Sequence, residues 1–311
     1  MRTLKGMVIR AQSGFLTVET DAGEYICRLR GRLKQGETEG DIVAVGDRVT
    51  ITPDDDGTGT IDEIHERKAA FSRVRSGIKR EYRQILLANP DQIVAVFACA
   101  EPEPHLRMLD RFLVIAEKQE IDALIIANKI DLVGQDGAEA MFGPYVDLGY
   151  PVVYTSAHTG QGLDTLRKKL KDKLSALAGP SGVGKSSLLN AIQPDLGLQV
   201  RSVSNATSKG RHTTQVRELF PLDVGGYVAD TPGIRSLALW DTEPEELDAY
   251  FVEMRELVAH CQFSDCTHTH EPGCAVRDAV EAGDVSQERY KSYLRLRFED
   301  DADLYETPDI A

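Results

Sequence analysis

Residues 174–190 read LSALAGPSGVGKSSLLN, and this stretch decides the fold. An apolar run, expected as a strand over Leu174–Ala178, leads into a loop that matches G-x-x-x-x-G-K-[ST], and a helix is expected over Lys185–Ile192. Glycines let backbone N–H groups wrap phosphates, and the helix N-terminus adds its dipole. We expect Lys185 to contact the β- and γ-phosphates, which makes it catalytic, and Ser186 to bind Mg²⁺. The predicted phosphate-binding residues are Gly179, Pro180, Ser181, Gly182, Val183, Gly184, Lys185, Ser186 and Ser187.

Apolar strands and helices alternate on the N-terminal side of this loop. The expected strands are Gln92–Ala98, Ala123–Ala127 and Pro151–Thr155, and the expected helices are Leu106–Gln119 and Leu163–Lys171. This rhythm predicts a mostly parallel α/β sheet covered on both faces. Ligands of such sheets bind beyond the carboxyl ends of the strands, where the phosphate loop also lies.

A second motif, Asn128-Lys129-Ile130-Asp131, directly follows one of these strands. The carboxylate of Asp131 can accept hydrogen bonds from N1–H and the exocyclic amine of guanine, which adenine does not present, so such a site rejects ATP. Asn128 would brace the loops, and the stem of Lys129 would cover the ring. On its own the tetrapeptide also fits an ordinary polar turn. Thr155-Ser156-Ala157 supplies a companion loop for guanine O6, and the combination predicts GTP or GDP bound by Asn128, Lys129, Ile130, Asp131, Ser156 and Ala157.

Two further segments match the Mg²⁺ and γ-phosphate contacts of GTPases. Asp230-Thr231-Pro232-Gly233 follows the apolar run Tyr227–Ala229, so Asp230 is expected to hold Mg²⁺ through water and the Gly233 amide to contact the γ-phosphate. In Gly210-Arg211-His212-Thr213-Thr214, one threonine should complete the Mg²⁺ shell. We favour Thr214, with Thr213 as the alternative. A turn and a flexible loop would explain the residues but not their spacing.

The order of these motifs is unusual. In ordinary GTPases the phosphate loop comes first, whereas here Asn128 precedes Gly179 by 51 residues and no second N-K-x-D follows Gly233. The sheet is therefore expected to be circularly permuted, which costs little because domain termini often lie close together. As a result, the Asp230–Gly233 loop runs directly into the C-terminal segment.

The first seventy residues are expected to form a barrel. Five short, alternating strands separated by Gly- and Asp-rich turns predict an OB-type barrel, which either binds RNA or only packs on its neighbour. Arg28, Arg30, Arg32 and Lys34 on a barrel loop form one basic patch. Residues 71–83, the junction with the next domain, contain a second patch of Arg73, Arg75, Lys79, Arg80 and Arg83. Both patches suit phosphate contacts, although each is also compatible with a solvated face.

The C-terminal segment has helical patterns over Pro244–His260 and Ser286–Phe298, with a cysteine cluster between them. Three thiolates and one imidazole form a closed set for a single structural Zn²⁺. Cys261, Cys266 and Cys274 supply the sulfurs, and spacing alone leaves His260, His268 and His270 as candidates for the fourth ligand. Reduced, buried cysteines are the alternative. With four protein ligands no coordination position stays open, which argues against a catalytic metal.

The charge distribution separates three expected domains. The chain has 311 residues and a net charge of −14, which excludes a uniformly basic nucleic-acid binder. Residues 1–70 carry 10 basic and 13 acidic side chains, residues 71–240 carry 20 and 18, and residues 241–311 carry 6 and 19. The acidity therefore lies mainly in the zinc segment and its tail. The chain lacks a signal-peptide pattern and a membrane-length apolar run, so we expect it in the cytoplasm, away from membranes.

Together these features resemble the circularly permuted GTPases, specifically the ribosome small-subunit-dependent GTPase A family of bacteria. The resemblance covers essentially the whole chain and rests on the barrel, the permuted order, GPSGVGKSSLLN, GRHTT, DTPG and the cysteine cluster. Gln215 stands where the family has threonine, which is a mild departure. The resemblance selects His268 as the fourth zinc ligand. It implies an OB-type barrel over 1–70, a circularly permuted P-loop GTPase domain over 71–240 and a helical zinc-binding domain with an acidic tail over 241–311.

The resemblance implies a GTP hydrolase that acts late in maturation of the small (30S) ribosomal subunit. It implies rRNA binding near the decoding region and GTP hydrolysis that controls release. The expected partners are 16S rRNA and ribosomal proteins of the small subunit, with GTP or GDP and Mg²⁺ bound to a monomer. An alternative is an RNA-binding occupancy factor for which GTP is a regulatory ligand with little turnover. A P-loop kinase or ATPase is a further alternative.

The residue after Gly233 affects the expected rate of GTP hydrolysis. Many GTPases place a water-orienting glutamine there, but this chain has Ile234, so intrinsic turnover should be slow. The resemblance implies that His212 positions the attacking water once the small subunit orders its loop, which would stimulate hydrolysis. Without the resemblance, the favoured interpretation of His212 is an exposed loop histidine with no role in hydrolysis. The predicted catalytic residues are His212, Lys185 and Thr214.

Overall fold

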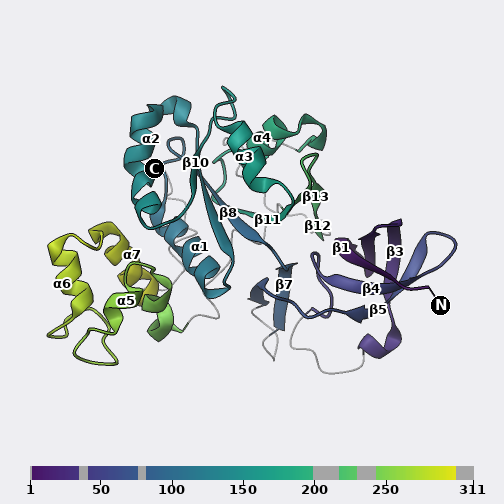
Figure 1. The fold of residues 1–311 in the computed structure, drawn as a ribbon, viewed down its shortest axis with the longest axis horizontal. Helices are drawn as coiled ribbons and strands as arrows, with labels where there is room; N and C mark the ends of the chain where they lie inside the picture. Colours follow the sequence, from purple (N-terminus) through teal and green to yellow (C-terminus); the bar gives the residue numbers. More distant parts are fainter. Residues whose placement is uncertain (1, 35–40, 76–81, 199–216, 230–242, 299–311) are drawn as a thin grey trace, which may run out of the picture.

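Five strands near the N-terminus close into a barrel (Figure 1). The structure, a computed structural model, describes residues 2–34, 41–75, 82–198, 217–229 and 243–298. The strands pair in the order β1-β2-β3-β5-β4, and β4 returns to β1. Pairing is antiparallel except between β3 and β5, and this closed ring agrees with the predicted OB-type barrel. The bounds are β1 Leu4–Gln12, β2 Phe15–Thr20, β3 Gly23–Leu29, β4 Arg48–Pro53 and β5 Thr58–Ile64, with a 3₁₀ turn η1 at Gly31–Lys34.

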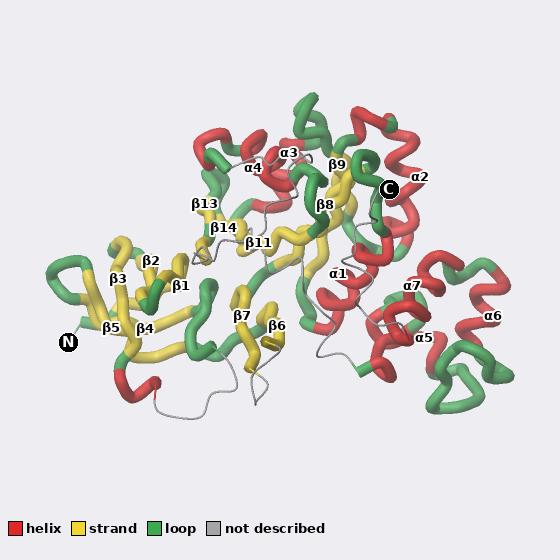
Figure 2. The backbone as a smooth tube through the Cα atoms, turned by 180° about the vertical axis from the view of Figure 1, so that it is seen from behind, coloured by secondary structure: helices red, strands yellow, loops and turns green. Residues whose placement is uncertain are grey.

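A second sheet of six strands forms the centre of the molecule (Figure 2). Its order is β10-β9-β8-β11-β14-β13, and every pairing is parallel except that of the edge strand β13. The strand carrying the phosphate loop, β11, lies between β8 and β14. The bounds are β8 Gln92–Ala98, β9 Asp122–Asn128, β10 Val152–Tyr154, β11 Lys173–Ala178, β13 Phe220–Pro221 and β14 Gly226–Ala229.

Alternation along the central strands assigns helices to the two faces of this sheet. On β8, Ile93 and Phe97 pack into the core that contains α1 and α2, whereas Val94 and Val96 pack into the core that contains α3 and α4. Every residue of β8 is buried, so both faces are covered. The helices are α1 Leu106–Lys118, α2 Gly134–Asp147, α3 Leu163–Leu170 and α4 Lys185–Ile192, with 3₁₀ turns η2 Ile130–Leu132 and η3 Pro194–Leu196.

A hairpin connects the barrel to the sheet. Strands β6 (Ala70–Arg75) and β7 (Tyr82–Ala88) pair with each other across the region that we expected to be only a basic junction. Phe71 and Leu87 are buried in the core of the central sheet. The N–H of Ala88 donates to the carbonyl of Val45 in the barrel at 2.9 Å, so the hairpin contacts both units.

A short strand provides a second connection to the barrel. Strand β12 (Arg217–Glu218) pairs with Arg10 and Ala11 of β1, and Arg10 also forms an ion pair with Glu218. The hydroxyl of Tyr227 on β14 donates to the carboxylate of Glu19 on β2. The barrel is thus bonded to two strands, β12 and β14, that lie in the sequence between the two segments expected to bind Mg²⁺ and the γ-phosphate.

The C-terminal segment is built from short helices packed on α1. The long helix expected over residues 244–260 is instead a 3₁₀ helix η6 (Pro244–Tyr250) and a single turn α5 (Arg255–Val258), followed by α6 (Ala275–Ala282) and α7 (Gln287–Phe298). Their core includes Val114 of α1 together with Phe251, Met254 and Tyr293. Among the described residues we find no helix with both the length and the apolar character that crossing a bilayer requires.

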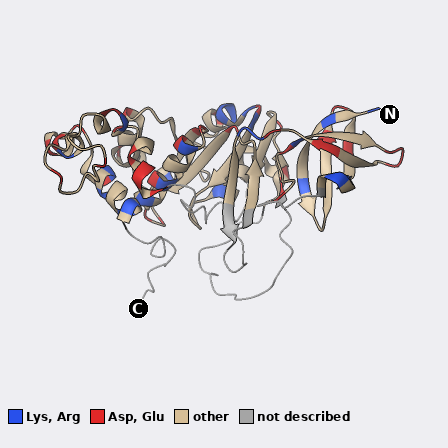
Figure 3. Ribbon diagram, turned by 90° about the horizontal axis from the view of Figure 1, so that it is seen from below, with Lys and Arg blue, Asp and Glu red and all other residues tan. Residues whose placement is uncertain are grey.

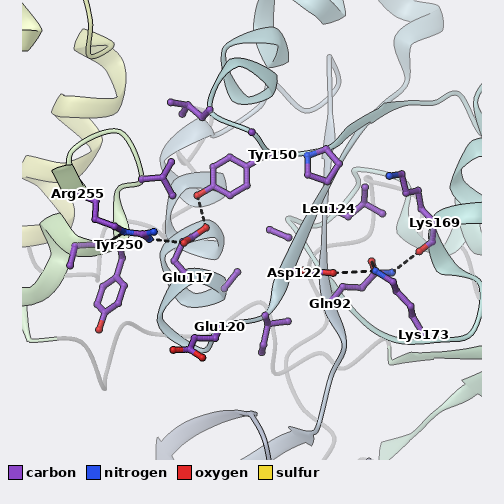
Figure 4. Close-up of a pocket in the computed structure, with 18 residues that line it drawn as sticks. Gln92, Glu117, Glu120, Asp122, Leu124, Tyr150, Lys169, Lys173, Tyr250 and Arg255 are labelled. Atoms are coloured by element: carbon purple, nitrogen blue, oxygen red, sulfur yellow. Dashed lines mark hydrogen bonds and ion pairs between the residues drawn. The ribbon is translucent and has the colours of Figure 1, made fainter. Parts of the chain in front are cut away.

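Ion pairs surround this apolar contact with α1. The Arg289 guanidinium of α7 pairs with Asp110 at 2.6 Å and with Glu253 at 2.7 Å, and all three side chains are almost fully buried. Nearer solvent, the carboxylate of Glu117 accepts from Tyr150 and pairs with Arg255, as Figure 4 shows. The two adjacent carboxylates keep Arg289 charged, and its pKa is raised despite burial.

Candidate functional site

The phosphate loop lies where β11 ends and α4 begins, at the carboxyl edge of the sheet. Three of its glycines adopt left-handed φ angles. A Cβ at Gly179 would lie 2.1 Å from the carbonyl oxygen of Val96, and one at Gly184 would lie 2.4 Å from Nδ2 of Asn128. Glycine is therefore required at both positions, because no side chain fits between the loop and its neighbouring strands.

Asn128 joins the phosphate loop to the two predicted base-binding loops. Its Nδ2 donates to the carbonyl of Val183 at 2.8 Å, and its Oδ1 accepts from the Thr155 hydroxyl at 3.2 Å. Asn128 and Thr155 are buried, so these bonds form in a site without water to replace them. The sequence motif indicated a bracing role for Asn128 but not that one side chain reaches both other loops.

In the rest of the predicted base site, the exposed carboxylate of Asp131 follows a buried residue, Ile130. Ile130 is buried, and its N–H donates to the carbonyl of Thr155 at 3.2 Å. This places Asp131, in the turn η2, at the surface with its carboxylate accessible. Lys129 has φ = 62°, and its ammonium donates to the carbonyl of Glu101 in the loop before α1, a partner that the sequence did not indicate.

The companion loop is also fixed by hydrogen bonds. Ser156 is buried, its backbone N–H donates to the carbonyl of Gln161 at 3.0 Å, and its hydroxyl accepts from the Thr159 N–H at 3.1 Å. Ala157 is half-buried beside it and packs against the core that contains α3 and α4. Both predicted base-contacting residues of this loop therefore lie at the same sheet edge as Asn128.

The ammonium of Lys185 forms hydrogen bonds within the phosphate loop itself. Lys185 is 5% exposed, and Nζ donates to the carbonyls of Gly179 at 2.8 Å and Pro180 at 2.6 Å. A nucleotide phosphate would exchange for these neutral acceptors and give stronger, charge-assisted bonds. Ser186 and Ser187 begin α4 half-buried. The predicted residues His212, Thr213, Thr214, Asp230 and Gly233 lie outside the described residues.

The four predicted metal ligands come together in the C-terminal segment. One ligand atom from each of Cys261, Cys266, His268 and Cys274 lies within 4.8 Å of the others. Nδ1 of His268 is 3.6 Å from Sγ of Cys261 and 3.3 Å from Sγ of Cys274. Three sulfurs and one nitrogen this close together fit tetrahedral Zn²⁺. Neither His260 nor His270 belongs to the cluster, so the choice of His268 agrees with the structure.

A carboxylate orients the histidine. Oδ2 of Asp248, on η6, lies 3.0 Å from Nε2 of His268, which leaves Nδ1 facing the sulfurs. Such carboxylate partners fix the ring and raise its basicity toward a metal. Asp248 lies 20 residues from His268, and spacing gave no signal for it. Residues that could hold zinc therefore exist in the chain, and the metal would supply folding energy to a loop with little apolar core.

Burial raises the pKa of four cysteine thiols, two in the predicted metal cluster and two elsewhere. It raises the pKa of Cys266 to about 12, chiefly by desolvation, and it also raises the pKa of Cys274. Cys27 in the barrel and Cys99 near Asp131 have pKa values raised to about 11 for the same reason. The latter two are isolated, buried thiols, so they remain protonated and unreactive at neutral pH.

Comparison with known proteins assigns the chain to a family. The RsgA GTPase profile matches residues 64–240, and the RsgA N-terminal domain profile matches residues 5–61. A protein of Gemmatimonas aurantiaca named small ribosomal subunit biogenesis GTPase RsgA is 50% identical over 298 residues, which cover 94% of this chain and 96% of that protein. The chain belongs to the RsgA GTPase family.

Solved structures support the same assignment. The crystal structure of YjeQ from Thermotoga maritima matches with a TM-score of 0.78 and 39% identity, covering 96% of this chain and 98% of that one. YloQ, described as a circularly permuted GTPase, matches with a TM-score of 0.73 and 36% identity, covering 95% and 94%. The predicted permuted GTPase fold and the predicted enzyme class, a GTPase, are thereby confirmed.

Proposed function

We propose that the chain is a GTPase that acts in biogenesis of the small ribosomal subunit, binds rRNA near the decoding region and uses GTP hydrolysis to control its release. The observation that carries this proposal is Asn128, which joins a phosphate loop to a guanine-type loop in a chain related over nearly its full length to proteins named for this activity. Such a factor would work in the cytoplasm as a monomer.

The proposed division is a barrel over residues 1–70, a GTPase domain over 71–240 and a zinc domain over 241–311. In the GTPase domain, Asp131 reads guanine, Lys185 neutralises the β- and γ-phosphates, and Ser186 with Thr214 binds Mg²⁺. Asp230 holds that ion through water, Gly233 contacts the γ-phosphate, and His212 orients the attacking water. The described geometry supports the first two assignments, because Lys185 and Asp131 lie on loops that Asn128 connects.

The outer face of β2 and β3 is the part of the barrel that we propose to contact rRNA. Phe15 is 43% exposed and Ile26 is 52% exposed, and the Arg28 guanidinium lies over the Phe15 ring at 4.6 Å from its centroid. Unpaired bases stack on exposed aromatic and cationic groups of this kind. Arg28 lies on β3, not on a loop as expected, and Arg30 pairs with Asp62. Figure 3 shows that acidic and basic residues are interspersed over the barrel.

The decisive experiment measures GTP turnover with purified small subunits, with large subunits and without ribosomes. We expect slow intrinsic hydrolysis and many-fold stimulation by small subunits alone. Binding that depends on GTP but brings no stimulation would instead indicate an occupancy factor. Stimulation should disappear in His212→Ala while nucleotide binding persists, and unchanged stimulation in that variant would exclude the role proposed for His212.

Base recognition is tested separately from the ribosome. GDP, and not ADP, should protect the chain against thermal unfolding. Asp131→Asn should weaken GDP binding roughly 100-fold, because a charge-assisted bond worth about 1.5–3 kcal/mol is lost. Asp136→Asn, which removes another exposed carboxylate at the start of α2, is the matched control. Equal protection by ADP would point to a P-loop kinase or ATPase.

A further inference from the structure

A groove of about 710 Å³ lies between α1, α2 and α7, and none of its lining residues belongs to the phosphate loop or to the two predicted base loops. Its apolar wall consists of Met108 of α1, Met141 and Pro144 of α2, and Leu148, which directly follows α2. None of these four is fully buried, so the wall is partly open to solvent. The groove is therefore a half-covered apolar surface at the junction of the GTPase unit and the zinc segment.

The floor of the groove is a completed ion network. Asp110 accepts from Arg289 at 2.6 Å and from the Tyr145 hydroxyl at 2.8 Å, and Arg289 also pairs with Glu253. These groups satisfy one another, so the floor itself does not require a ligand. It does fix α7 against α1, and with it the position of the groove's two walls.

The rim of the groove is predominantly cationic. Arg107 lies on one side, while Lys291 and Arg295 lie on the exposed face of α7. Of the acidic residues in the lining, Asp110 is paired with Arg289, and Glu288 is paired with Lys291 at 2.7 Å. An anionic segment that also carries apolar side chains matches this combination of rim and wall.

The chain contains such a segment directly after α7. Residues 299–311 read EDDADLYETPDIA, with six acidic side chains, no lysine or arginine, and the apolar residues Leu304, Tyr305 and Ile310. Arg295 precedes Glu299 by four residues, which is about one helical turn or 5.4 Å. Thirteen residues can extend about 43 Å, twice the roughly 21 Å length of α2, so the segment can follow the whole groove.

We propose that the acidic segment 299–311 docks in the groove between α1, α2 and α7 of its own chain. Its carboxylates pair with the cations of the rim, and its apolar side chains cover the methionine wall. The docked segment bridges α7 of the zinc segment to α1 and α2 of the GTPase unit. It also accounts for the concentration of negative charge beside a basic groove.

The test uses the chain shortened to residues 1–298 and a fluorescent peptide of residues 299–311. The peptide should bind the shortened chain, and the full chain should bind it at least 10-fold more weakly because its own segment fills the groove. A peptide with its acids replaced by Asn and Gln should also lose at least 10-fold. If the shortened chain does not bind the acidic peptide, or the full chain binds it equally well, the proposal is wrong.

Two charge-reversal variants of the shortened chain locate the site. Arg107→Glu with Arg295→Glu, one residue from each wall, should reduce peptide binding at least 10-fold. Lys168→Glu with Lys171→Glu, at the exposed end of α3 on the other face of the sheet, is the matched control and should not reduce it. Equal loss in both pairs would show nonspecific charge attraction. Hydrogen exchange of the full and shortened chains completes the test, because residues 140–148 should exchange more slowly when the segment is present.

The molar mass of the full chain distinguishes docking within one chain from docking between two. A monomer at micromolar concentration is expected, whereas a dimer that dissociates on shortening to residue 298 would overturn docking within the chain. None of these readouts requires GTP or ribosomes. Failure of this proposal therefore leaves the proposed GTPase function untouched.

Discussion

In the barrel, strands pair in a closed ring around a core of their own, whereas residues 243–298 form short helices around four potential metal ligands. The buried barrel core includes Val18, Val49, Ile51 and Ile61. The core of the zinc segment instead includes Val114, which belongs to α1 of the GTPase unit. The two units thus differ in what stabilises them. Strand pairing around its own core stabilises the barrel, whereas potential metal ligands and packing on α1 stabilise residues 243–298.

Metal removal should produce the largest difference in stability between the two units. In Cys274→Ser, or after chelation, residues 243–298 should lose protection from hydrogen exchange while the barrel keeps it. Zinc contributes on the order of 10 kcal/mol to small structural sites at neutral pH, which is far more than one side-chain contact. Zinc content and exchange by mass spectrometry measure the effect. Cys27→Ser is the control and should retain the zinc, and barrel unfolding on chelation would contradict the comparison.

The next largest effect is expected at the docking interface. Arg289→Ala should lower the free energy of unfolding by about 3–5 kcal/mol, because Asp110 and Glu253 would remain buried without their cation. Denaturant unfolding measures this change. Arg255→Ala removes the 52%-exposed partner of Glu117 at the same interface and should cost under about 1 kcal/mol. Similar costs for both variants would show that burial does not govern this contact.

A substitution that creates a cavity in the barrel tests the comparison from the other side, by destabilising the barrel and not the zinc segment. Ile51→Ala should destabilise the barrel by roughly 2–5 kcal/mol, because Ile51 is fully buried and the strands cannot close around the lost volume. Hydrogen exchange should increase in residues 4–64 and the zinc content should stay unchanged. Loss of zinc in this variant would mean that the two units unfold as one.

The smallest effect is expected where the barrel meets β12. Glu218→Gln removes an ion pair with Arg10 whose side chains are 30% and 48% exposed, so the cost should be about 0–1 kcal/mol. The backbone pairing of β12 with β1 remains. A thermal shift series in rising salt measures the effect, which should vanish at high salt. A larger loss would identify this pair as a principal anchor of the barrel.

Much of the fold could be predicted from the sequence because its strands are strongly patterned. The expected strand Gln92–Ala98 matches β8, and the helix predicted after the phosphate loop matches α4. Helix α2 was missed because it begins Gly-Gln-Asp-Gly and contains Pro144, so neither propensity nor periodicity marked it. The hairpin β6–β7 was missed because its strands pair with each other and pack on two other units, and neither contact appears in a local pattern.

In the candidate sites too, features local in the sequence were predicted, and contacts between distant elements were not. Motif spacing indicated the phosphate loop and the cysteine cluster because each depends on residues close together in the chain. It did not indicate the Asn128–Val183 bond, or the contact of Asp248 with His268, because both join separate elements. The single helix expected over residues 244–260 was wrong, since a 3₁₀ helix there turns Asp248 toward the metal ligands.

The pairing of β12 with β1 has a consequence for dividing the chain into fragments. Arg10 and Glu218 stand 208 positions apart, yet they lie on one ladder at the far half of β1, beyond the part that β4 covers. A fragment of residues 1–70 would therefore keep its ring but expose the backbone of that half-strand. Bare strand edges recruit other strands. Such a fragment is expected to self-associate, and adding back a short strand in the manner of β12 should keep it monomeric.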